Sequence, residues 1–152
     1  SLNNKIVVDL GCGNGVLGLH VLHQHKLANV VFCDESYMAV ASTKHNVMAN
    51  MPDKVNQCEF IVNNCLDDFV NHSKFSEVDI ILCNPPFHQQ STITDHIAWQ
   101  MFNDAKSVLK KGGQLFVVGN RHLDYPKKLK RLFGVITTVA TNKKFSILSV
   151  TK

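Results

Sequence analysis

The sequence predicts an α/β domain built on a mainly parallel sheet of seven strands. Short apolar runs rich in β-branched residues alternate with stretches of helical spacing, which is typical of consecutive strand–helix–strand units. A glycine-rich segment directly follows the first run, and the last two runs flank a short polar turn. With 152 residues and 45% hydrophobic content, the chain can bury one core. We therefore expect a single domain over residues 1–152.

The first half of the chain alternates strands and helices. Residues 16–24 and 37–50 are predicted to be helical, and Ser36 can cap the second helix before Pro52 ends it. Five apolar runs are predicted to form the parallel strands, at residues 6–10, 30–33, 60–62, 78–83 and 115–119.

The clearest helix is predicted at residues 94–111, because its apolar positions recur at helical spacing. Thr94 can cap its start, and Lys110-Lys111-Gly112-Gly113 places cations and then glycine where a helix usually ends. Residues 135–140 and 145–150 are predicted to form a terminal antiparallel hairpin at the edge of the sheet.

The composition favours a protein of the reducing cytoplasm. The five cysteines are odd in number and none forms a C-x-x-C pair, which argues against a disulfide framework or a zinc site. No apolar run approaches the roughly 18 residues of a membrane span, so we expect no membrane partner. From the cysteine pattern we also expect no metal partner. The formal charge of +4 permits a polyanionic partner without demonstrating one. Only residues 1–5 precede the first strand, and we expect a domain excised from a longer chain.

The segment Asp9-Leu10-Gly11-Cys12-Gly13-Asn14-Gly15 ends the first strand and opens a helix. Glycines at such a turn let the backbone approach a ligand closely, and Asp34 at the end of the next strand can accept hydrogen bonds from ribose hydroxyls. Val16 stands where the dinucleotide fingerprint requires its third glycine, which disfavours a nicotinamide dehydrogenase. We therefore predict a nucleoside-bearing cofactor, with a purely structural turn as the alternative.

The tetrapeptide Asn84-Pro85-Pro86-Phe87 directly follows the strand predicted at residues 78–83. A strand cannot continue through two prolines, because each lacks the N–H that a ladder requires. The chain must leave the sheet at Asn84, carrying a carboxamide, backbone carbonyls and an aromatic ring. These groups are suited to gripping a flat group that carries an NH2, and the alternative is a proline-punctuated loop with an Asn cap.

These motifs together resemble those of a known family. Asp9-x-Gly11-x-Gly13-x-Gly15 with Asp34 resembles the cofactor motif of class I S-adenosylmethionine-dependent methyltransferases, and Asn84-Pro85-Pro86-Phe87 resembles their amino-methylating signature. The resemblance implies the Rossmann-like fold of that class and S-adenosylmethionine as the cofactor. The positions that it implies in cofactor binding are Asp9, Gly11, Cys12, Gly13, Gly15, Asp34, Asn64, Cys65 and Asn84.

The resemblance also implies separate roles for these positions. Asp9 would help to orient the methionine portion, Asp34 would bind the ribose, and Asn64 with Cys65 would frame the adenine, although Asn64 can also be read as a turn residue. The catalytic positions would be Asn84, Pro85 and Phe87. In the family mechanism the Asn side-chain oxygen and the Pro carbonyl accept the hydrogens of the attacking amine, and the aromatic ring stacks on the base.

A narrower resemblance covers residues 7–150. Asn84-Pro85-Pro86-Phe87-His88-Gln89-Gln90, Ala98-Trp99-Gln100-Met101-Phe102 and Asn120-Arg121-His122-Leu123-Asp124-Tyr125 resemble segments of the ribosomal RNA guanine-N2 methyltransferases. The match is better to those of the large subunit than to those of the small subunit. It implies ribosomal RNA as the partner and an N-terminal domain that this chain lacks.

Basic residues near the carboxyl edge of the sheet are predicted to contact RNA. The stretch at residues 127–133 is amphipathic, so its cations are expected to face outward while Leu129, Leu132 and Phe133 face inward. A solvated helix face is the alternative. The predicted RNA-binding residues are His88, Arg121, His122, Lys127, Lys128, Lys130 and Arg131.

Two further roles for histidines, a general base and a zinc site, are less well supported by the sequence. His88 could act as a general base, but a histidine beside a stacked base more often forms hydrogen bonds or packs. His20, His23 and His25 could suggest zinc, yet no acid or thiolate completes a ligand set, so an amphipathic surface is favoured.

The leading interpretation is therefore an enzyme that methylates the N2 amine of a guanine in ribosomal RNA. The same motif serves any planar amine, so methylation of protein glutamine or of adenine N6 remains an alternative. A cofactor-binding RNA module without catalysis is the second alternative, and the intact Asp9, Asp34 and Asn84 disfavour it.

Overall fold

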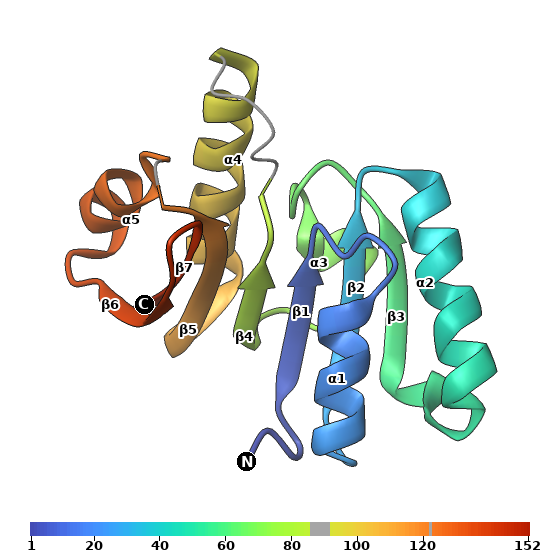
Figure 1. Cartoon of the computed structure of the whole chain (residues 1–152). Coiled ribbons are helices and arrows are strands. Elements are labelled where there is room, and N and C mark those ends of the chain that lie inside the picture. Colours follow the sequence, from blue (N-terminus) through green and yellow to red (C-terminus); the bar gives the residue numbers. More distant parts are fainter. Residues whose placement is uncertain (86–91, 122) are drawn as a thin grey trace.

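The computed structural model describes residues 1–85, 92–121 and 123–152 of the chain. Its centre is a seven-stranded sheet in the order β3-β2-β1-β4-β5-β7-β6, shown in Figure 1. The strands are β1 (Ile6–Leu10), β2 (Asn29–Asp34), β3 (Cys58–Val62), β4 (Val78–Cys83), β5 (Leu109–Asn120), β6 (Thr137–Thr141) and β7 (Phe145–Thr151). The first five are parallel, and β7 pairs antiparallel with both β5 and β6. The predicted fold class and terminal hairpin are confirmed.

Helices connect the consecutive strands from β1 to β6. They are α1 (Val16–Gln24), α2 (Tyr37–Asn50), the 3-10 turn η1 (Pro52–Gln57), α3 (Phe69–His72), α4 (Thr92–Val108) and α5 (Tyr125–Phe133). The Ser36 side chain accepts a hydrogen bond from the Ala39 N–H at 3.2 Å, so it caps α2 as predicted. Within the described residues, no helix is both long and apolar enough to cross a membrane.

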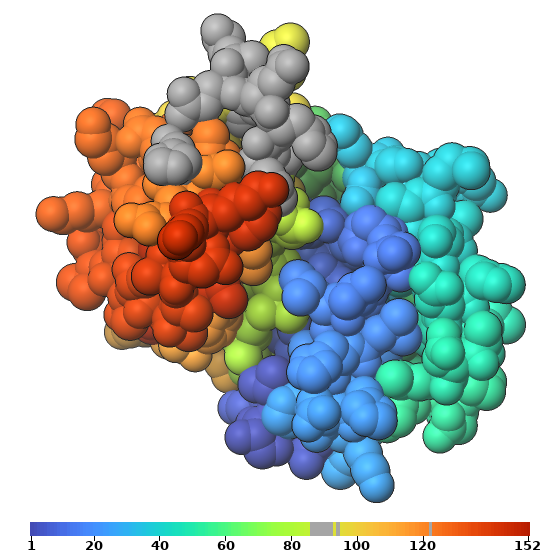
Figure 2. All heavy atoms as spheres, viewed as in Figure 1, coloured from blue at the N-terminus to red at the C-terminus, as the bar shows by residue number. Residues whose placement is uncertain are grey.

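The two faces of the sheet build two separate hydrophobic clusters. Val7, Val30 and Phe32 point to the side covered by α1 and α2, whereas Val8 and Val31 point to the side of α4 and α5. This alternation is what a parallel strand buried on both faces requires. Figure 2 shows that the surfaces of α1 and α2 (blue to cyan) are separated from those of the C-terminal elements (orange to red) by β4 (yellow-green).

The prediction for residues 94–111 was wrong at both ends. Helix α4 begins at Thr92, so Thr94 lies inside it, and it ends at Val108. The residues expected to close the helix belong to β5 instead, because Leu109 is fully buried and pairs with Val78. Gly112 has a φ of 85°, which lets the chain form the irregularity between the two strands without strain.

The last strands lie close to their predicted positions. β6 begins two residues later than the predicted run and extends to Thr141, and all five of its residues are exposed. β5 is longer than predicted because it also contains the segment before residue 115.

Candidate functional site

The loop between β1 and α1 is shaped by its glycines. Gly11, Gly13 and Gly15 have φ values of 73°, 56° and 88°, a region that other residues rarely adopt. A Cβ at Gly11 would lie 2.8 Å from the Asn84 carbonyl oxygen, and one at Gly15 would lie 2.7 Å from the Thr43 side chain. A Cβ at Gly13 would enter open space. The backbone at Gly13 thus borders open space, where a ligand can approach it closely.

Asp9 lies beneath this loop and is only 1% exposed. Its Oδ2 accepts a hydrogen bond from the Gly18 N–H at 3.0 Å, which ties β1 to the first turn of α1. Burial raises the pKa of Asp9 from 3.8 to about 7, although the Gly18 hydrogen bond opposes the shift. A positive charge bound near the loop would therefore favour the ionised carboxylate.

Asp34 joins the glycine loop to the start of α2. Its Oδ2 accepts a hydrogen bond from the Gly13 N–H at 3.1 Å, and its Oδ1 accepts one from the Ser36 N–H at 2.9 Å. The carboxylate therefore fixes the position of Gly13 relative to β2. Each oxygen can still accept a further hydrogen bond.

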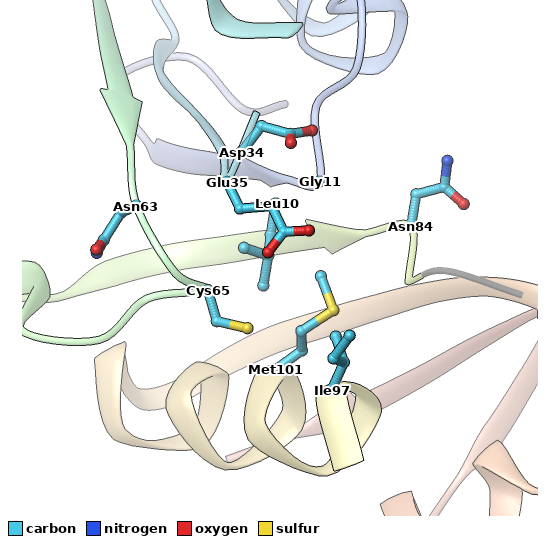
Figure 3. Close-up of a pocket in the computed structure, with 9 residues that line it drawn as sticks. All are labelled: Leu10, Gly11, Asp34, Glu35, Asn63, Cys65, Asn84, Ile97 and Met101. Carbon is cyan, nitrogen blue, oxygen red and sulfur yellow. The ribbon is translucent and has the colours of Figure 1, made fainter. Parts of the chain in front are cut away.

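A cavity of about 280 Å³ opens at the carboxyl ends of the parallel strands, where such sheets usually bind their ligands. Figure 3 shows its lining, in which the Glu35 side chain points towards Met101 on α4, whereas the side chains of Asn63 and Asn84 point away from that helix. The lining residues are Leu10, Gly11, Asp34, Glu35, Asn63, Cys65, Asn84, Ile97 and Met101. A flat aromatic group fits between an apolar wall and hydrogen-bonding edges of this kind.

A second cavity of about 360 Å³ lies on the α1 side of the sheet. It is lined by Asp9, Gly11, Cys12, Gly13, Asn14, Val16, Leu17, Asn84 and Val118. Gly11 and Asn84 line both cavities. The Asn84 side chain is exposed, while its backbone N–H donates to the Leu10 carbonyl oxygen at 3.2 Å. A ligand that extends through both cavities would therefore pass Asn84 at its middle.

The structure brings most of the predicted cofactor residues to these two cavities. Asp9, Gly11, Cys12, Gly13, Asp34, Cys65 and Asn84 line one cavity or both. Gly15 packs against Thr43 instead, and Asn63 rather than Asn64 lines the first cavity. Pro85 is buried next to Asn84. Phe87, His88 and His122 lie outside the described residues, so their predicted roles stay predictions.

The sequence interpretation missed Glu35, Asn63, Ile97 and Met101, four of the residues that line the first cavity. Glu35 and Asn63 each stand one position from a predicted residue, so strand-end placement was the only available signal. Ile97 and Met101 follow helical i, i+4 spacing and were taken simply as core residues.

The cysteines around the site are protonated at neutral pH. Burial raises the pKa of Cys12, Cys33 and Cys65 to about 12, and it also raises the pKa of Cys83. Cys12 and Cys65 line the two cavities, where a small neutral side chain leaves room for a ligand. Across residues 1–85, 92–121 and 123–152, no group of three or more His, Cys, Asp or Glu residues could hold a metal ion.

Lys128 is a correction to the predicted basic face of α5. It is only 5% exposed, and its ammonium forms an ion pair with Asp95 of α4 and lies 3.9 Å from Asp124. The ammonium also lies 5.5 Å from the centre of the Trp99 ring. Lys128 lies on the helix face that packs against α4, next to Leu129, and therefore cannot face solvent.

The other cations of this region are exposed as predicted. Lys127, Lys130 and Arg131 lie on the outer face of α5, and Arg131 lies 5.9 Å from the centre of the Trp99 ring. The Arg121 guanidinium donates to the Asn142 carbonyl oxygen at 3.2 Å, which holds it against the β6–β7 turn. These exposed cations are available to a polyanion.

Comparison with known proteins identifies close relatives. Ribosomal RNA large subunit methyltransferase G of Pseudoalteromonas atlantica is 63% identical over 151 residues, which cover 99% of this chain and 39% of that protein. The protein of the same name from Klebsiella pneumoniae is 62% identical over 146 residues, which cover 96% of this chain and 38% of that protein. The chain therefore spans about two fifths of the length of the curated relatives that it matches.

A solved structure and a family model agree with these relatives. The Thermus thermophilus 16S rRNA N2 methyltransferase, solved in complex with AdoMet and guanosine, superposes with a TM-score of 0.84 and 28% identity. The match covers 99% of this chain and 38% of that one. The family model described as the methyltransferase small domain matches residues 1–149. Since this model spans nearly the whole chain, the chain belongs to the methyltransferase small domain family.

Proposed function

We propose that this chain binds S-adenosylmethionine and transfers its methyl group to the exocyclic N2 amine of a guanine in ribosomal RNA. The names of the relatives and the ligands of the Thermus thermophilus structure support this proposal. We also propose that the chain is the catalytic domain of a longer cytoplasmic protein with a further N-terminal domain, because the relatives are more than twice as long.

The observation that carries the proposal is the position of Asn84 at the junction of the two cavities. The reactive methyl group of S-adenosylmethionine lies between its adenosine and amino-acid halves. A cofactor with one half in each cavity would therefore present its methyl group near Gly11 and Asn84. This is where an amine held by Asn84 would need it for an in-line displacement.

The residues present fit the cofactor. The first cavity offers carboxylates to an adenosine, with Ile97 and Met101 as an apolar wall for its ring. The open space at Gly13 can accept the amino-acid half close to the backbone. When bound, S-adenosylmethionine supplies a positively charged sulfur from which the methyl group departs easily.

Asn84 would make the amine a better nucleophile. The lone pair of an exocyclic amine is delocalised into the ring of the base, so it must be localised before it can attack. The Asn84 side-chain oxygen and the Pro85 carbonyl are proposed to accept the two amine hydrogens, which favours the tetrahedral nitrogen of the transition state. Asn84 is exposed to an incoming base, and its backbone is held by Leu10. Its position is therefore defined before the substrate binds.

Binding of RNA is proposed to involve the exposed cations of α5 together with Arg121. Phosphate contacts of this kind position an RNA without reading its sequence. A base paired within a helix could not reach Asn84, so the target guanine would have to be unpaired or turned outward.

The decisive experiment is mass analysis of nucleosides from ribosomal RNA incubated with the full-length protein and isotope-labelled S-adenosylmethionine. The expected product is labelled N2-methylguanosine, and the Asn84→Ala variant is the matched control. Detection of labelled N6-methyladenosine would show that the methylated amine is N6 of adenine and not N2 of guanine. Label in a glutamine side chain of a protein substrate, with none in RNA, would refute the RNA proposal.

A further inference from the structure

We propose that the turn between β6 and β7 binds a backbone phosphate next to the target guanine. The turn contributes Lys143 and Lys144, and Arg121 directly after β5 adds a third cation; these three residues are called the turn cations below. The inference rests on the proposed RNA substrate. It assigns a role to two lysines that the sequence interpretation placed only in a polar turn.

The sheet brings the turn to the edge that carries the candidate site. Strand β7 runs antiparallel to β5, so its first residue, Phe145, pairs with Asn120 at the end of β5. Strands β4 and β5 are parallel, and Cys83 at the end of β4 pairs with Val117. The turn therefore lies at the same edge of the sheet as Asn84, although it is far from Asn84 in the sequence.

Strand β5 extends beyond the last residue of β4. Val118 lines the second cavity together with Asn84, and Arg121 follows Val118 by three residues. At about 3.3 Å per residue, the Arg121 backbone lies about 10 Å beyond the level of Val118. Within one nucleotide, the sugar separates the base from its phosphates by a length of this order. A guanine held at Asn84 would therefore place a flanking phosphate near the turn cations.

Hydrogen bonds hold the turn in one shape and attach it to β5. The Asn142 Oδ1 accepts hydrogen bonds from the N–H groups of Lys144 at 2.8 Å and Phe145 at 2.7 Å. The Arg121 N–H donates to the Lys144 carbonyl oxygen at 2.9 Å. The Lys144 ammonium lies 5.3 Å from the centre of the Phe145 ring. The cations are therefore positioned before RNA binds, which lowers the entropic cost of a phosphate contact.

Within the part of the chain that the structure describes, no acid forms an ion pair with the turn cations, and all three are exposed. The nearest acid along the chain, Asp124, lies 3.9 Å from the ammonium of Lys128 instead. Arg121 uses one guanidinium nitrogen to hold Asn142 and can donate from its others. Three such cations on one short surface fit the charge of a phosphodiester.

The test is a binding cycle with trinucleotides that carry a central guanosine, measured by calorimetry on the full-length protein saturated with S-adenosylhomocysteine. One ligand has two phosphodiesters, and two others replace either the 5′ or the 3′ linkage with an uncharged methylphosphonate. We expect the double variant Lys143→Gln, Lys144→Gln to bind the phosphodiester form about 10-fold more weakly than wild type, as for loss of charged hydrogen bonds. The loss should nearly disappear for the ligand that lacks the charge held by the turn.

The matched control removes two positive charges at the opposite edge of the sheet. Lys26 precedes β2 and Lys111 lies near the start of β5, and both are exposed. The double variant Lys26→Gln, Lys111→Gln has the same net charge as the turn variant. It should bind all three trinucleotides as wild type does. Arg121 is left unchanged in both variants, because its guanidinium also holds the turn.

Three results would overturn the inference. Equal affinity of wild type and the turn variant for the phosphodiester form would mean that the turn contacts no phosphate beside the base. An equal loss for all three ligands, or the same loss in the control variant, would mean that the lysines act only through net charge. A trinucleotide with central inosine, which lacks the N2 amine, tests the base separately. If wild type binds it as tightly as the guanosine form, the guanine proposal fails, whereas the phosphate contact is still measured by the turn variant.

Discussion

The Asn84 side chain is exposed at the junction of the two cavities, while its backbone is anchored to Leu10. Replacing it with alanine should therefore remove an acceptor for the amine without moving the cofactor residues. We expect Asn84→Ala to lower kcat by about 100-fold or more and to change the S-adenosylhomocysteine affinity less than about threefold, which is the pattern of an interaction made in the transition state. Single-turnover kinetics and calorimetry measure the two quantities.

Asn84→Asp is the matched variant, because it keeps an acceptor oxygen of the same reach. It should retain more activity than Asn84→Ala if the acceptor role is correct. Equal turnover of wild type and Asn84→Ala would contradict the proposed mechanism.

Asp9 makes the stability of the folded protein depend on pH. Because burial raises its pKa from 3.8 to about 7, the folded chain holds a proton there that the unfolded chain releases. This contribution to stability is fully present below about pH 4 and is lost as the pH rises through about 7. Asp9→Asn keeps an acceptor for Gly18 and cannot ionise. Relative to wild type it should gain stability between pH 4 and pH 8, by up to about 4 kcal/mol at 1.4 kcal/mol per pKa unit.

Urea unfolding of wild type and Asp9→Asn across this pH range measures the difference. Parallel stability curves would show that Asp9 has an ordinary pKa in the folded protein. The affinity for S-adenosylhomocysteine should also differ between wild type and Asp9→Asn, since Asp9 lines the second cavity.

Helix α5 separates its cations into two groups with different surroundings. Lys127, Lys130 and Arg131 are exposed, whereas the charge of Lys128 is buried against Asp95. Replacing the three exposed cations with glutamine should reduce the slope of log affinity against log salt by about two to three, since roughly 0.7 to 0.9 counterions are released per phosphate contact. Lys128→Gln should leave the slope unchanged.

Electrophoretic or fluorescence binding assays with a ribosomal RNA fragment at several salt concentrations measure these slopes. An unchanged slope in the triple variant would mean that the exposed face of α5 contacts solvent and not RNA. A reduced slope in Lys128→Gln would show that the ion pair with Asp95 opens to admit phosphate.

The elements of the fold were largely predictable because their signals are local. Alternating apolar runs and helical spacing located every parallel strand, and Ser36 marked the start of α2. The end of α4 was mispredicted, because the burial of Leu109 against Val78 is a tertiary effect that overrides a helix-ending sequence. The burial of Lys128 likewise depends on Asp95 and Trp99 of another helix.

At the scale of the whole molecule, the candidate site was predictable where topology alone assembles it. The carboxyl ends of parallel strands meet at one edge, so Gly11, Asp34 and Asn84 had to be close together. Which of two successive residues enters the cavity depends on how each strand ends. The spacing of residues in the sequence therefore could not predict that Glu35 and Asn63 line the cavity.

The buried thiols have a consequence for how the protein tolerates oxidants and electrophiles. A thiol reacts through its thiolate, and the raised pKa values of Cys12, Cys33 and Cys65 keep that form scarce at physiological pH. We expect the folded chain to react with a thiol-specific reagent at pH 8 roughly 100-fold more slowly than the chain unfolded in guanidinium. Rapid titration of the folded chain would contradict this expectation. A cleft lined by Cys12 and Cys65 can thus stay chemically silent, and the proposed methylation should continue through an oxidative episode that disables enzymes with exposed, acidic thiols.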